Sequence, residues 1–339
     1  MTRILSSLLL LTTLSPATSF QPTTVWRSAS SKPHHHPSSL QMTDVTVFGG
    51  TGFLGSRVCK LLVSRGASSV TSISKSGSVP KWCKDEEWTS KVQWKSVDLL
   101  SSGNEAAIDE ACGSPTAVVS CVGVVGTDFD LLKRGNGDSN VNAFASAKRG
   151  GKLKRAVYVS VGAEVDACKE NWLPEFFKGY FQGKIMGENA AIDSVGDYAK
   201  NVCLVKPTFI YGGSEFGLLP PRVNFQYGSA VEELLFLPPF KFLADITPGL
   251  IKVALRPPVC VDSVAAACAK AALDESGDLP TTLDGTEQIN KYAKQPDSTG
   301  LTDALAWTRE KLGEFYNWAK VEVPKALDSI QSKLDEAKK

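Results

Sequence analysis

The chain has 339 residues, of which 42% are apolar and 22% charged, an ordinary composition for a globular protein. Its formal net charge of +1 at pH 7 gives no positive field, so we expect no nucleic-acid partner. From Asp44 onward no uncharged apolar run is long enough to span a bilayer, which excludes a transmembrane helix in that part of the sequence.

The first 43 residues predict a two-part leader. Arg3 precedes an apolar run over 4–14 and then small residues, which is typical of a signal peptide. Residues 20–42 are rich in Ser, Thr and Pro and contain no acidic residue, as transit peptides do. A signal peptide followed by a transit peptide, with Phe20 just after the expected cut, resembles the leaders of algal proteins imported into secondary plastids. We expect a plastid location; a plain secretory signal and a mitochondrial presequence are the alternatives.

Histidine and cysteine usage excludes several kinds of site. All three histidines, at 34–36, lie in the leader, so the rest of the chain has no histidine base, triad or metal ligand. The eight cysteines are scattered and no two have C-x-x-C spacing, which argues against zinc and thioredoxin-like sites. We expect no metal, and we expect the cysteines to be small core residues in a reducing compartment.

Residues 45–55 read as a strand, a glycine turn and the start of a helix. Gly49 would allow the tight turn, Gly52 would let the backbone approach a pyrophosphate, and Gly55 would let the helix pack closely. The helix N-terminus would add unpaired N–H groups and a partial positive charge. The alternative is a glycine-rich turn without a ligand. The predicted cofactor contacts of this turn are Gly49, Thr51, Gly52, Phe53, Leu54 and Gly55.

The second strand, over 70–74, ends where NAD-specific folds place an acidic residue on the ribose 2′-OH. This chain has Ser74, Lys75 and Ser76 there, and a hydroxyl and an ammonium suit a 2′-phosphate. We therefore expect NADP(H) rather than NAD(H), although an exposed lysine after a strand is also commonplace.

Strands and helices alternate further along the chain. Strands are predicted at 92–97, which ends before Asp98, and at 117–123, 155–161 and 202–206, and the last of these runs into Pro207. Helices are predicted at 104–112, 140–149 and 176–191. This alternation predicts an α/β fold with a doubly wound parallel Rossmann sheet of order 3-2-1-4-5-6, and the ligand at the carboxyl ends of the strands.

The C-terminal part is less regular. A proline-broken apolar insert at 214–258 precedes a helix at 261–273, a short stretch at 281–283 that would add a seventh strand, and a helix at 288–293. The tail has two helical stretches, of which the second carries one apolar stripe: Val323, Leu327, Ile330 and Leu334. We expect three parts: the leader at 1–43, a dinucleotide-binding domain at 44–294 with the insert as a substrate lid, and a helical tail at 295–339.

Tyr180 and Lys184 are four residues apart and therefore lie on one face of a helix. A lysine one turn from a phenol would lower the tyrosine pKa and favour proton transfer, and its ammonium would bind the nicotinamide ribose. Ser160, at the end of the fifth strand, would hold a substrate oxygen. These three residues are the candidate catalytic set.

The chain resembles an extended or atypical short-chain dehydrogenase/reductase over residues 44–293. The motifs that carry the resemblance are Gly49-x-x-Gly52-x-x-Gly55, Asp98, the 120–123 turn, Ser160, Tyr180-x-x-x-Lys184 and Pro207. The resemblance implies that Asp98 touches the adenine and that Val122, Gly123 and Pro207 line the cofactor site. It also implies that the Ser, Tyr and Lys catalyse, and that Tyr180 and Lys184 contact the cofactor as well. The segment 180–188 is also similar to a complex I Rossmann accessory subunit, a fungal coenzyme Q accessory protein and plant plastid lipid-body proteins.

Two functions of different class follow. The first is an NADP-dependent oxidoreductase, and the apolar insert favours a small apolar substrate such as a quinone-like or lipid-like carbonyl. The second is a nucleotide-binding accessory factor that contacts a membrane, a lipid body or a larger complex through the insert and the tail. An epimerase or dehydratase on the same site is a third. The sequence does not indicate an oligomeric state.

Overall fold

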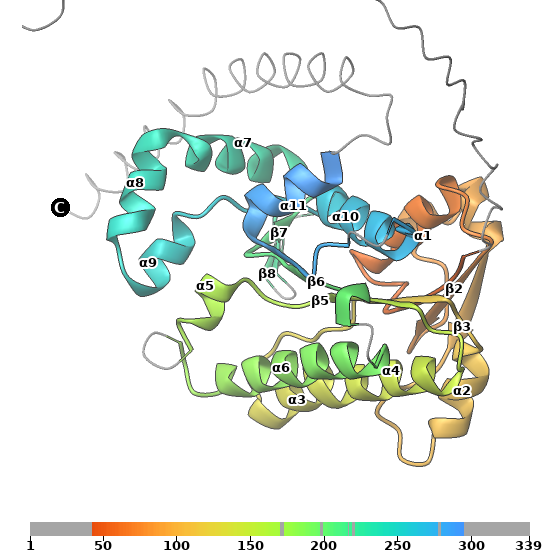
Figure 1. Cartoon of the computed structure of the whole chain (residues 1–339). Coiled ribbons are helices and arrows are strands. Elements are labelled where there is room, and N and C mark those ends of the chain that lie inside the picture. The colour runs from red at the N-terminus through yellow and green to blue at the C-terminus, as the bar shows by residue number, and fades with distance from the viewer. Residues whose placement is uncertain are drawn as a thin grey trace, which may run out of the picture. The chain divides into compact units, whose positions relative to one another are not determined.

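The structure is a computed structural model that describes residues 43–294 except 170–172, 197–198, 216, 219–220 and 277–278. Its centre is a seven-stranded, all-parallel sheet, which confirms the predicted strand order and the seventh strand (Figure 1). From one edge to the other the strands are β11 (Thr282–Asp284), β6 (Val202–Lys206), β5 (Arg155–Val159), β4 (Ala117–Ser120), β1 (Asp44–Phe48), β2 (Ser69–Ser74) and β3 (Val92–Ser96).

The central strands are buried on both faces because helices cover both sides of the sheet. Every residue of β4 and β5 is buried, as expected for strands between two helical layers. One layer consists of α1 (Gly55–Ser64), α10 (Val261–Leu273) and α11 (Gly285–Lys294). The other consists of α2 (Glu105–Cys112), α4 (Ser139–Arg149) and α6 (Phe177–Ser194) (Figure 1). Each layer therefore has its own hydrophobic core.

A short helical run before α4 was not expected from the sequence. It comprises α3 (Phe129–Lys133) and a π-helical turn at Arg134–Asp138 that continues into α4. The Asp128 side chain caps α3 by accepting a hydrogen bond from the Leu131 N–H at 2.7 Å. After β5 the chain forms the short helix α5 (Ala163–Asp166). Short 3-10 turns lie at Lys81–Cys83, Glu87–Lys91 and Ala199–Asn201.

The insert after β6 is largely helical. Two residues of β7 (Ile210–Tyr211) pair with β10 (Val259–Cys260), and between them lie the pair β8 (Gly217–Leu218) and β9 (Pro221–Arg222). The helices α7 (Phe225–Phe236), α8 (Pro238–Ile246) and α9 (Gly249–Ala254) follow, and prolines and Gly249 separate them rather than prevent helix formation. Pro238 occupies the first helical position of α8, where proline is well tolerated.

The cysteines form no disulfide bonds. All eight cysteines are free thiols, and burial raises the pKa of Cys112 to about 11 and that of Cys121 to about 12.

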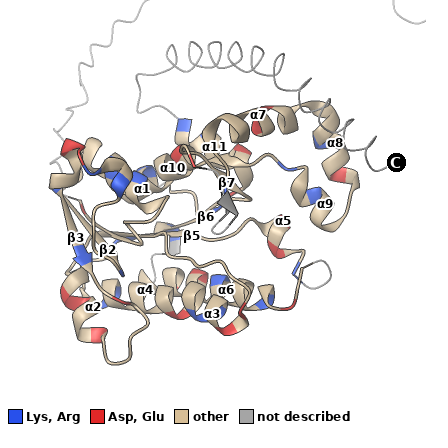
Figure 2. Ribbon diagram, turned by 180° about the vertical axis from the view of Figure 1, so that it is seen from behind, with Lys and Arg blue, Asp and Glu red and all other residues tan. Residues whose placement is uncertain are grey.

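Within the described ranges no helix is both long and apolar enough to cross a membrane. Basic and acidic residues are interspersed along the helices in the view of Figure 2. The leader and the tail lie outside the described residues, so the predictions made for them remain predictions.

Candidate functional site

The glycine turn between β1 and α1 is tight, and it leaves no room for a side chain at Gly55. Gly49 has a φ of +77°, and its N–H donates to the Ile73 carbonyl on β2 at 2.8 Å. A Cβ on Gly55 would lie 2.2 Å from the Gly49 carbonyl oxygen, and one on Gly52 would lie 3.1 Å from the same atom. The third glycine therefore lets α1 start directly against the turn, as the sequence predicted.

The start of α1 fits an anionic ligand. Among the described residues, the backbone N–H groups of Phe53 and Leu54 donate to no other backbone group outside the regular elements. The first turn of α1 carries no acidic residue that would oppose the positive end of the helix dipole. A tight glycine turn beside amide donors that no described backbone group uses fits the pyrophosphate of a dinucleotide.

The structure brings together two predicted adenosine contacts that lie on neighbouring strand ends. The Lys75 Nζ lies 3.0 Å from the Asp98 Oδ2, although the lysine side chain is 83% exposed. The Leu100 N–H donates to Asp98 at 3.0 Å, and this bond and Lys75 lower the pKa of the Asp98 carboxyl. Ser74 accepts from the Gly77 N–H at 3.1 Å, so its oxygen is already engaged in the turn after β2.

Two asparagines, not expected from the sequence, hold the turn that contains Val122 and Gly123. Asn136, fully buried in the π-helical turn, accepts from the Val124 N–H at 3.2 Å and donates to the Val124 carbonyl at 3.0 Å. Asn140 accepts from the Ser120 hydroxyl. A Cβ on Gly123 would lie 3.1 Å from the Asn136 Oδ1. The π-helical turn thus fixes the end of β4.

Lys184 and Tyr180 lie side by side on α6, but their charges differ from expectation. The Lys184 Nζ donates to the Val159 carbonyl at 2.9 Å and lies 5.7 Å from the centre of the Tyr180 ring. Burial lowers the pKa of Lys184 to about 8 and raises that of Tyr180 to about 12. The expected lowering of the tyrosine pKa is therefore wrong for this state, because desolvation of the phenol outweighs an ammonium that is bonded elsewhere.

Ser160 is part of a polar chain that the sequence did not reveal. Its hydroxyl donates to a carboxylate oxygen of Glu188, one turn beyond Lys184 on α6. The same carboxylate pairs with the Lys206 Nζ at 2.9 Å, where both side chains are only 19% exposed. Because a paired carboxylate is an acceptor only, the serine proton is directed at Glu188. Ser160 and Lys184 both lie at the end of β5: Ser160 directly follows the strand, and Lys184 donates to the carbonyl of Val159, the last residue of the strand.

Three glycines spaced four apart explain the unusual sequence of α6. A Cβ on Gly179 would lie 2.2 Å from the Phe129 carbonyl oxygen, and one on Gly187 would lie 2.5 Å from the Tyr158 hydroxyl. A Cβ on Gly183, between them, would lie 2.8 Å from the Lys133 carbonyl oxygen at the end of α3 and 2.9 Å from Asn136 in the π-helical turn. The glycine stripe lets α6 approach α3 and β5 closely, and this contact sets the positions of Tyr180 and Lys184.

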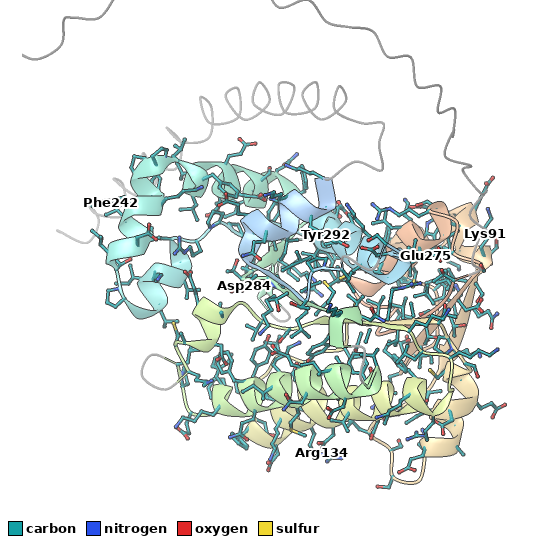
Figure 3. All side chains as sticks on the ribbon, in the orientation of Figure 1. Lys91, Arg134, Phe242, Glu275, Asp284 and Tyr292 are labelled. Atoms are coloured by element: carbon teal, nitrogen blue, oxygen red, sulfur yellow. The ribbon has the colours of Figure 1, made fainter. Side chains whose placement is uncertain are left out.

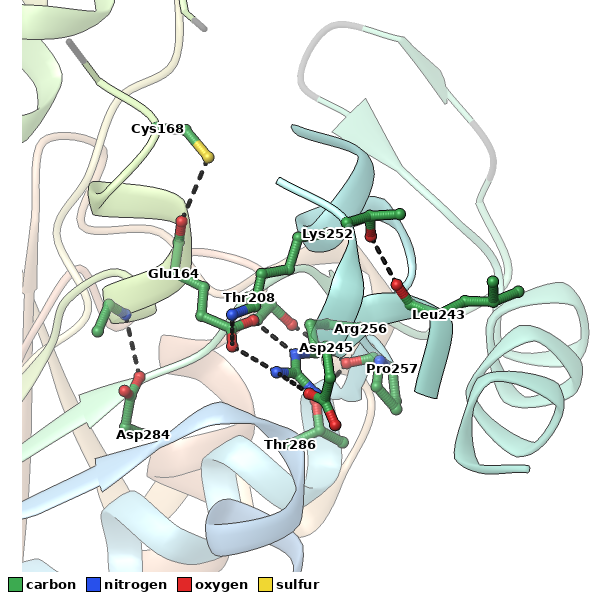
Figure 4. Close-up of polar contacts among 12 residues, drawn as sticks. Glu164, Cys168, Thr208, Leu243, Asp245, Lys252, Arg256, Pro257, Asp284 and Thr286 are labelled. Atoms are coloured by element: carbon green, nitrogen blue, oxygen red, sulfur yellow. Dashed lines mark hydrogen bonds and ion pairs between the residues drawn. The ribbon is translucent and has the colours of Figure 1, made fainter. Parts of the chain in front are cut away.

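The insert forms a charged cavity of about 460 Å³ at the ends of β5, β6 and β11. The Arg256 guanidinium makes two 2.7 Å bonds to Glu164 and one of 3.1 Å to Asp245 (Figure 4). Pro207 accepts from the Gly162 N–H at 2.9 Å, which joins the end of β6 to the segment after β5. Although the insert is apolar in overall composition, this cavity is lined mainly by polar and charged residues.

A second cavity of about 570 Å³ lies between α7, α10 and α11. Its walls include the aromatic rings of Tyr211, Phe225 and Phe236. Glu232 accepts from the Tyr211 hydroxyl and from the Asn290 amide, each at 2.6 Å, and burial raises the pKa of its carboxyl. This cavity combines apolar surface with a few fixed polar groups, as small-molecule sites do.

The strand order together with the glycine turn defines a Rossmann-type dinucleotide-binding protein. The model of the NAD dependent epimerase/dehydratase family matches residues 45–233, more than half of the chain. The chain belongs to this family. The resemblance to the short-chain dehydrogenase/reductases is confirmed at this level.

Several known proteins are similar to the chain. An uncharacterized chloroplastic protein of Arabidopsis thaliana is 32% identical over 68% of this chain and 72% of its own. MIOREX complex component 2 of Saccharomyces cerevisiae is 36% identical over 23% of this chain and 28% of its own. The solved structure of the Bordetella bronchiseptica enzyme WbmF with NAD+ and UDP is 17% identical over 87% of this chain and 97% of its own, with a TM-score of 0.49.

Proposed function

We propose that the protein binds a nicotinamide dinucleotide at the 49–55 turn and acts as an NADP(H)-dependent oxidoreductase. The observation that carries the proposal is the turn itself, where the backbone N–H groups of Phe53 and Leu54 have no backbone acceptor among the described residues and can bind a ligand's phosphates beside the start of α1. Membership of an NAD-dependent family supports dinucleotide binding. Titration of the purified protein with NADPH and NADH tests it directly.

The side chains near the end of β5 would handle the proton. When bound, the nicotinamide supplies the hydride. With a pKa of about 12, Tyr180 holds its proton at neutral pH and would act as a proton donor, which favours reduction of a carbonyl. Lys184, with a pKa of about 8, is mostly charged at pH 7 and would bind the ribose hydroxyls. Ser160 donates its proton to Glu188, so its oxygen is left as an acceptor and would bind the hydroxyl group of an alcohol product.

The NADP preference depends on Lys75. Its ammonium lies at the end of β2 and is largely exposed, and no carboxylate follows the strand directly. A 2′-phosphate there would compete with Asp98 for the ammonium. We expect tighter binding of NADPH than NADH, and Lys75→Glu should reverse or erase this preference. Equal affinity of the unaltered protein for both dinucleotides would refute the NADP assignment and leave dinucleotide binding intact.

The proposed substrate is a small apolar carbonyl, for example a quinone-like ring. The aromatic walls of the cavity between α7, α10 and α11 support an apolar ligand, although Ser160, Tyr180 and Lys184 do not line that cavity. A screen for NADPH oxidation against quinones and lipid carbonyls tests the class. Tyr180→Phe keeps the ring and should lower turnover by about two to four powers of ten while NADPH binding stays unchanged. Turnover unaffected by this change would remove Tyr180 from the chemistry.

A non-catalytic accessory role is the second candidate, and exposed apolar side chains on the insert favour it. Phe242 is 63% exposed, Ile246 61% and Ile251 55%, all on α8 and α9. Figure 3 shows Phe242 on the outer side of α8. One relative is named as a component of a complex, which agrees with docking to a partner. Full replacement in cells of the normal protein by Tyr180→Phe, with NADPH bound and no turnover, would support this role over catalysis.

An epimerase or dehydratase is the third candidate, favoured by the description of the family. Such an enzyme would return its dinucleotide unchanged after each cycle, so it would show no net NADPH oxidation. Incubation with nucleotide sugars and analysis of the products separates it from a reductase. Conversion of a sugar without net dinucleotide consumption would replace the oxidoreductase proposal.

We also propose that the protein acts in a plastid. The two-part leader supports this location, as does the chloroplastic name of one relative. A fluorescent fusion of residues 1–45 should enter the plastid, and Phe20→Ala should hold it in the endomembrane system. Mitochondrial fluorescence from the unaltered leader would favour the alternative.

A further inference from the structure

A cavity of about 230 Å³ lies directly against the glycine turn. Thr51, Gly52 and Phe53 form one wall, and Trp82 and residues 212–215 form others. Two arginines complete the lining, Arg57 from α1 and Arg222 from β9. The cavity is smaller than the roughly 300–1,000 Å³ of ordinary small-molecule sites, so it suits one group of a ligand rather than a whole dinucleotide.

Arg57 is fixed in place. Its Nη1 donates to the Phe53 carbonyl at 2.6 Å, and its Nε pairs with the Asp262 carboxylate at 3.2 Å. The guanidinium carbon lies 4.6 Å from the centre of the Phe53 ring and 4.7 Å from that of Trp82. The Trp82 indole is in turn held by its hydrogen bond to Ser56 at 3.2 Å. A guanidinium held this way loses little entropy when it binds a further group.

Arg222 brings a second positive charge to the same ring. Its guanidinium carbon lies 4.4 Å from the centre of the Phe53 ring. Burial and the charge of Arg57 lower the pKa of Arg222, and the charge of Glu215 raises it. Glu215 is exposed, and the Asp262 side chain that pairs with Arg57 is 68% exposed, so solvent screens both carboxylates. Both guanidinium groups line the cavity and would attract an anion that enters it.

We propose that Arg57 and Arg222 bind a phosphate group in this cavity, together with the backbone of the glycine turn, and that the group is the pyrophosphate of the dinucleotide. The assignment rests on the proposed dinucleotide binding. It adds two side chains to a contact otherwise made by backbone N–H groups. The planar fork of each guanidinium matches phosphate oxygens, and charge-assisted bonds of this kind are about twice as strong as neutral ones.

The test is a titration of the whole protein with NADPH, NADH and inorganic pyrophosphate, followed by calorimetry and by tryptophan fluorescence, since Trp82 lines the cavity. Arg222→Met should weaken the binding of all three about tenfold to a hundredfold, as expected for a lost charge-assisted bond. Arg222→Lys should recover part of the affinity because it keeps the charge without the fork.

Lys241→Met is the matched control. Lys241 also lies over an aromatic ring, 5.1 Å from the centre of Phe236, but it lines the cavity at the ends of β5, β6 and β11 and not the one at the turn. It should leave all three affinities unchanged, and unfolding curves should show that both methionine variants are folded.

The outcomes separate the inference from the function on which it rests. Weakened NADPH binding with unchanged NADH binding would move Arg222 to a 2′-phosphate and overturn the pyrophosphate assignment. Unchanged affinities of a folded Arg222→Met would overturn the phosphate site itself. Failure of the unaltered protein to bind either dinucleotide would refute the proposed function, and pyrophosphate binding lost in Arg222→Met would then still support the phosphate site.

Discussion

At the scale of single residues, burial decides which protonation states the candidate site holds. Lys184 is only 6% exposed and its pKa falls to about 8, while that of Tyr180 rises to about 12. Both shifts favour the neutral form, because removing either group from water penalises its charge. In the ligand-free site the Tyr180 phenol is therefore protonated at neutral pH, and the Lys184 ammonium loses its proton more easily than that of a free lysine.

We expect the binding of the dinucleotide to depend on pH through Lys184. Below pH 8 its ammonium is charged and donates, and above pH 8 the charge is lost, about two and a half units earlier than for a free lysine. The affinity for NADH should therefore fall between pH 7 and pH 9. Lys184→Met should bind more weakly at pH 7 and lose this pH dependence. A pH profile that is flat in the unaltered protein would contradict the role.

The ion pair between Lys75 and Asp98 should weaken the interaction of the Lys75 ammonium with a 2′-phosphate and so lower the preference for NADPH. Asp98→Asn removes the carboxylate that lies 3.0 Å from the ammonium, yet an amide oxygen still accepts the Leu100 N–H. We expect the preference for NADPH over NADH to rise by a factor of about 1.4–5, which corresponds to the roughly 0.2–1 kcal/mol typical of an exposed pair. Ratios of dissociation constants measure it. A lower preference in this variant would mean that Asp98 holds Lys75 in place for the phosphate.

The sequence identified the residues whose role is local and missed those whose role depends on distant partners. Gly49 and Gly55 were predictable because a turn between a strand and a helix dictates them. Glu188 was not, because its partners Ser160 and Lys206 lie 28 and 18 residues away in sequence. Asn136 was missed for the same reason. It serves a turn twelve residues earlier, and nothing in its neighbourhood marks a π-helical turn.

At the scale of elements, α6 is a helix shaped by what it packs against. Each glycine destabilises the helix by up to about 1 kcal/mol relative to alanine, so these glycines do not contribute to the stability of the helix itself. The close approach of Gly179 to α3 and of Gly187 to β5 compensates this cost. The predicted helix at 176–191 agrees with α6 at Phe177–Ser194, and the reason for its glycines became visible only in the fold.

Gly187→Ala tests this packing. The added methyl group would lie 2.5 Å from the Tyr158 hydroxyl, and Tyr158 is fully buried. We expect the free energy of unfolding to fall by about 1–3 kcal/mol, since overpacking outweighs the gain in helix propensity. Denaturant unfolding measures it, with Asn189→Ala on the exposed side of α6 as a control that should change little. Unchanged stability would show that α6 can shift outward.

At the scale of the whole molecule, the periodic part of the sequence predicted the sheet and the insert escaped prediction. Strand order follows from alternation and right-handed crossovers, and both leave local traces in the sequence. The insert bears prolines and a mixed apolar pattern, so its three helices and its charged inner wall were not predictable. Its polar groups face the cavity at the ends of β5, β6 and β11, whereas many of its large apolar side chains face outward.

The outward apolar side chains of α8 should mediate attachment if the accessory role is correct. In a flotation assay the protein should rise with lipid vesicles, and Phe242→Ser with Ile246→Ser should lower the bound fraction about tenfold or more, because each exposed side chain contributes about 1.5–3 kcal/mol when buried. Val125→Ser changes a side chain that is 54% exposed after β4 and should have no effect. NADPH binding should stay the same in all variants. Failure of the unaltered protein to float would leave a protein partner as the ligand of this surface, and the double variant should then lose that partner in cells.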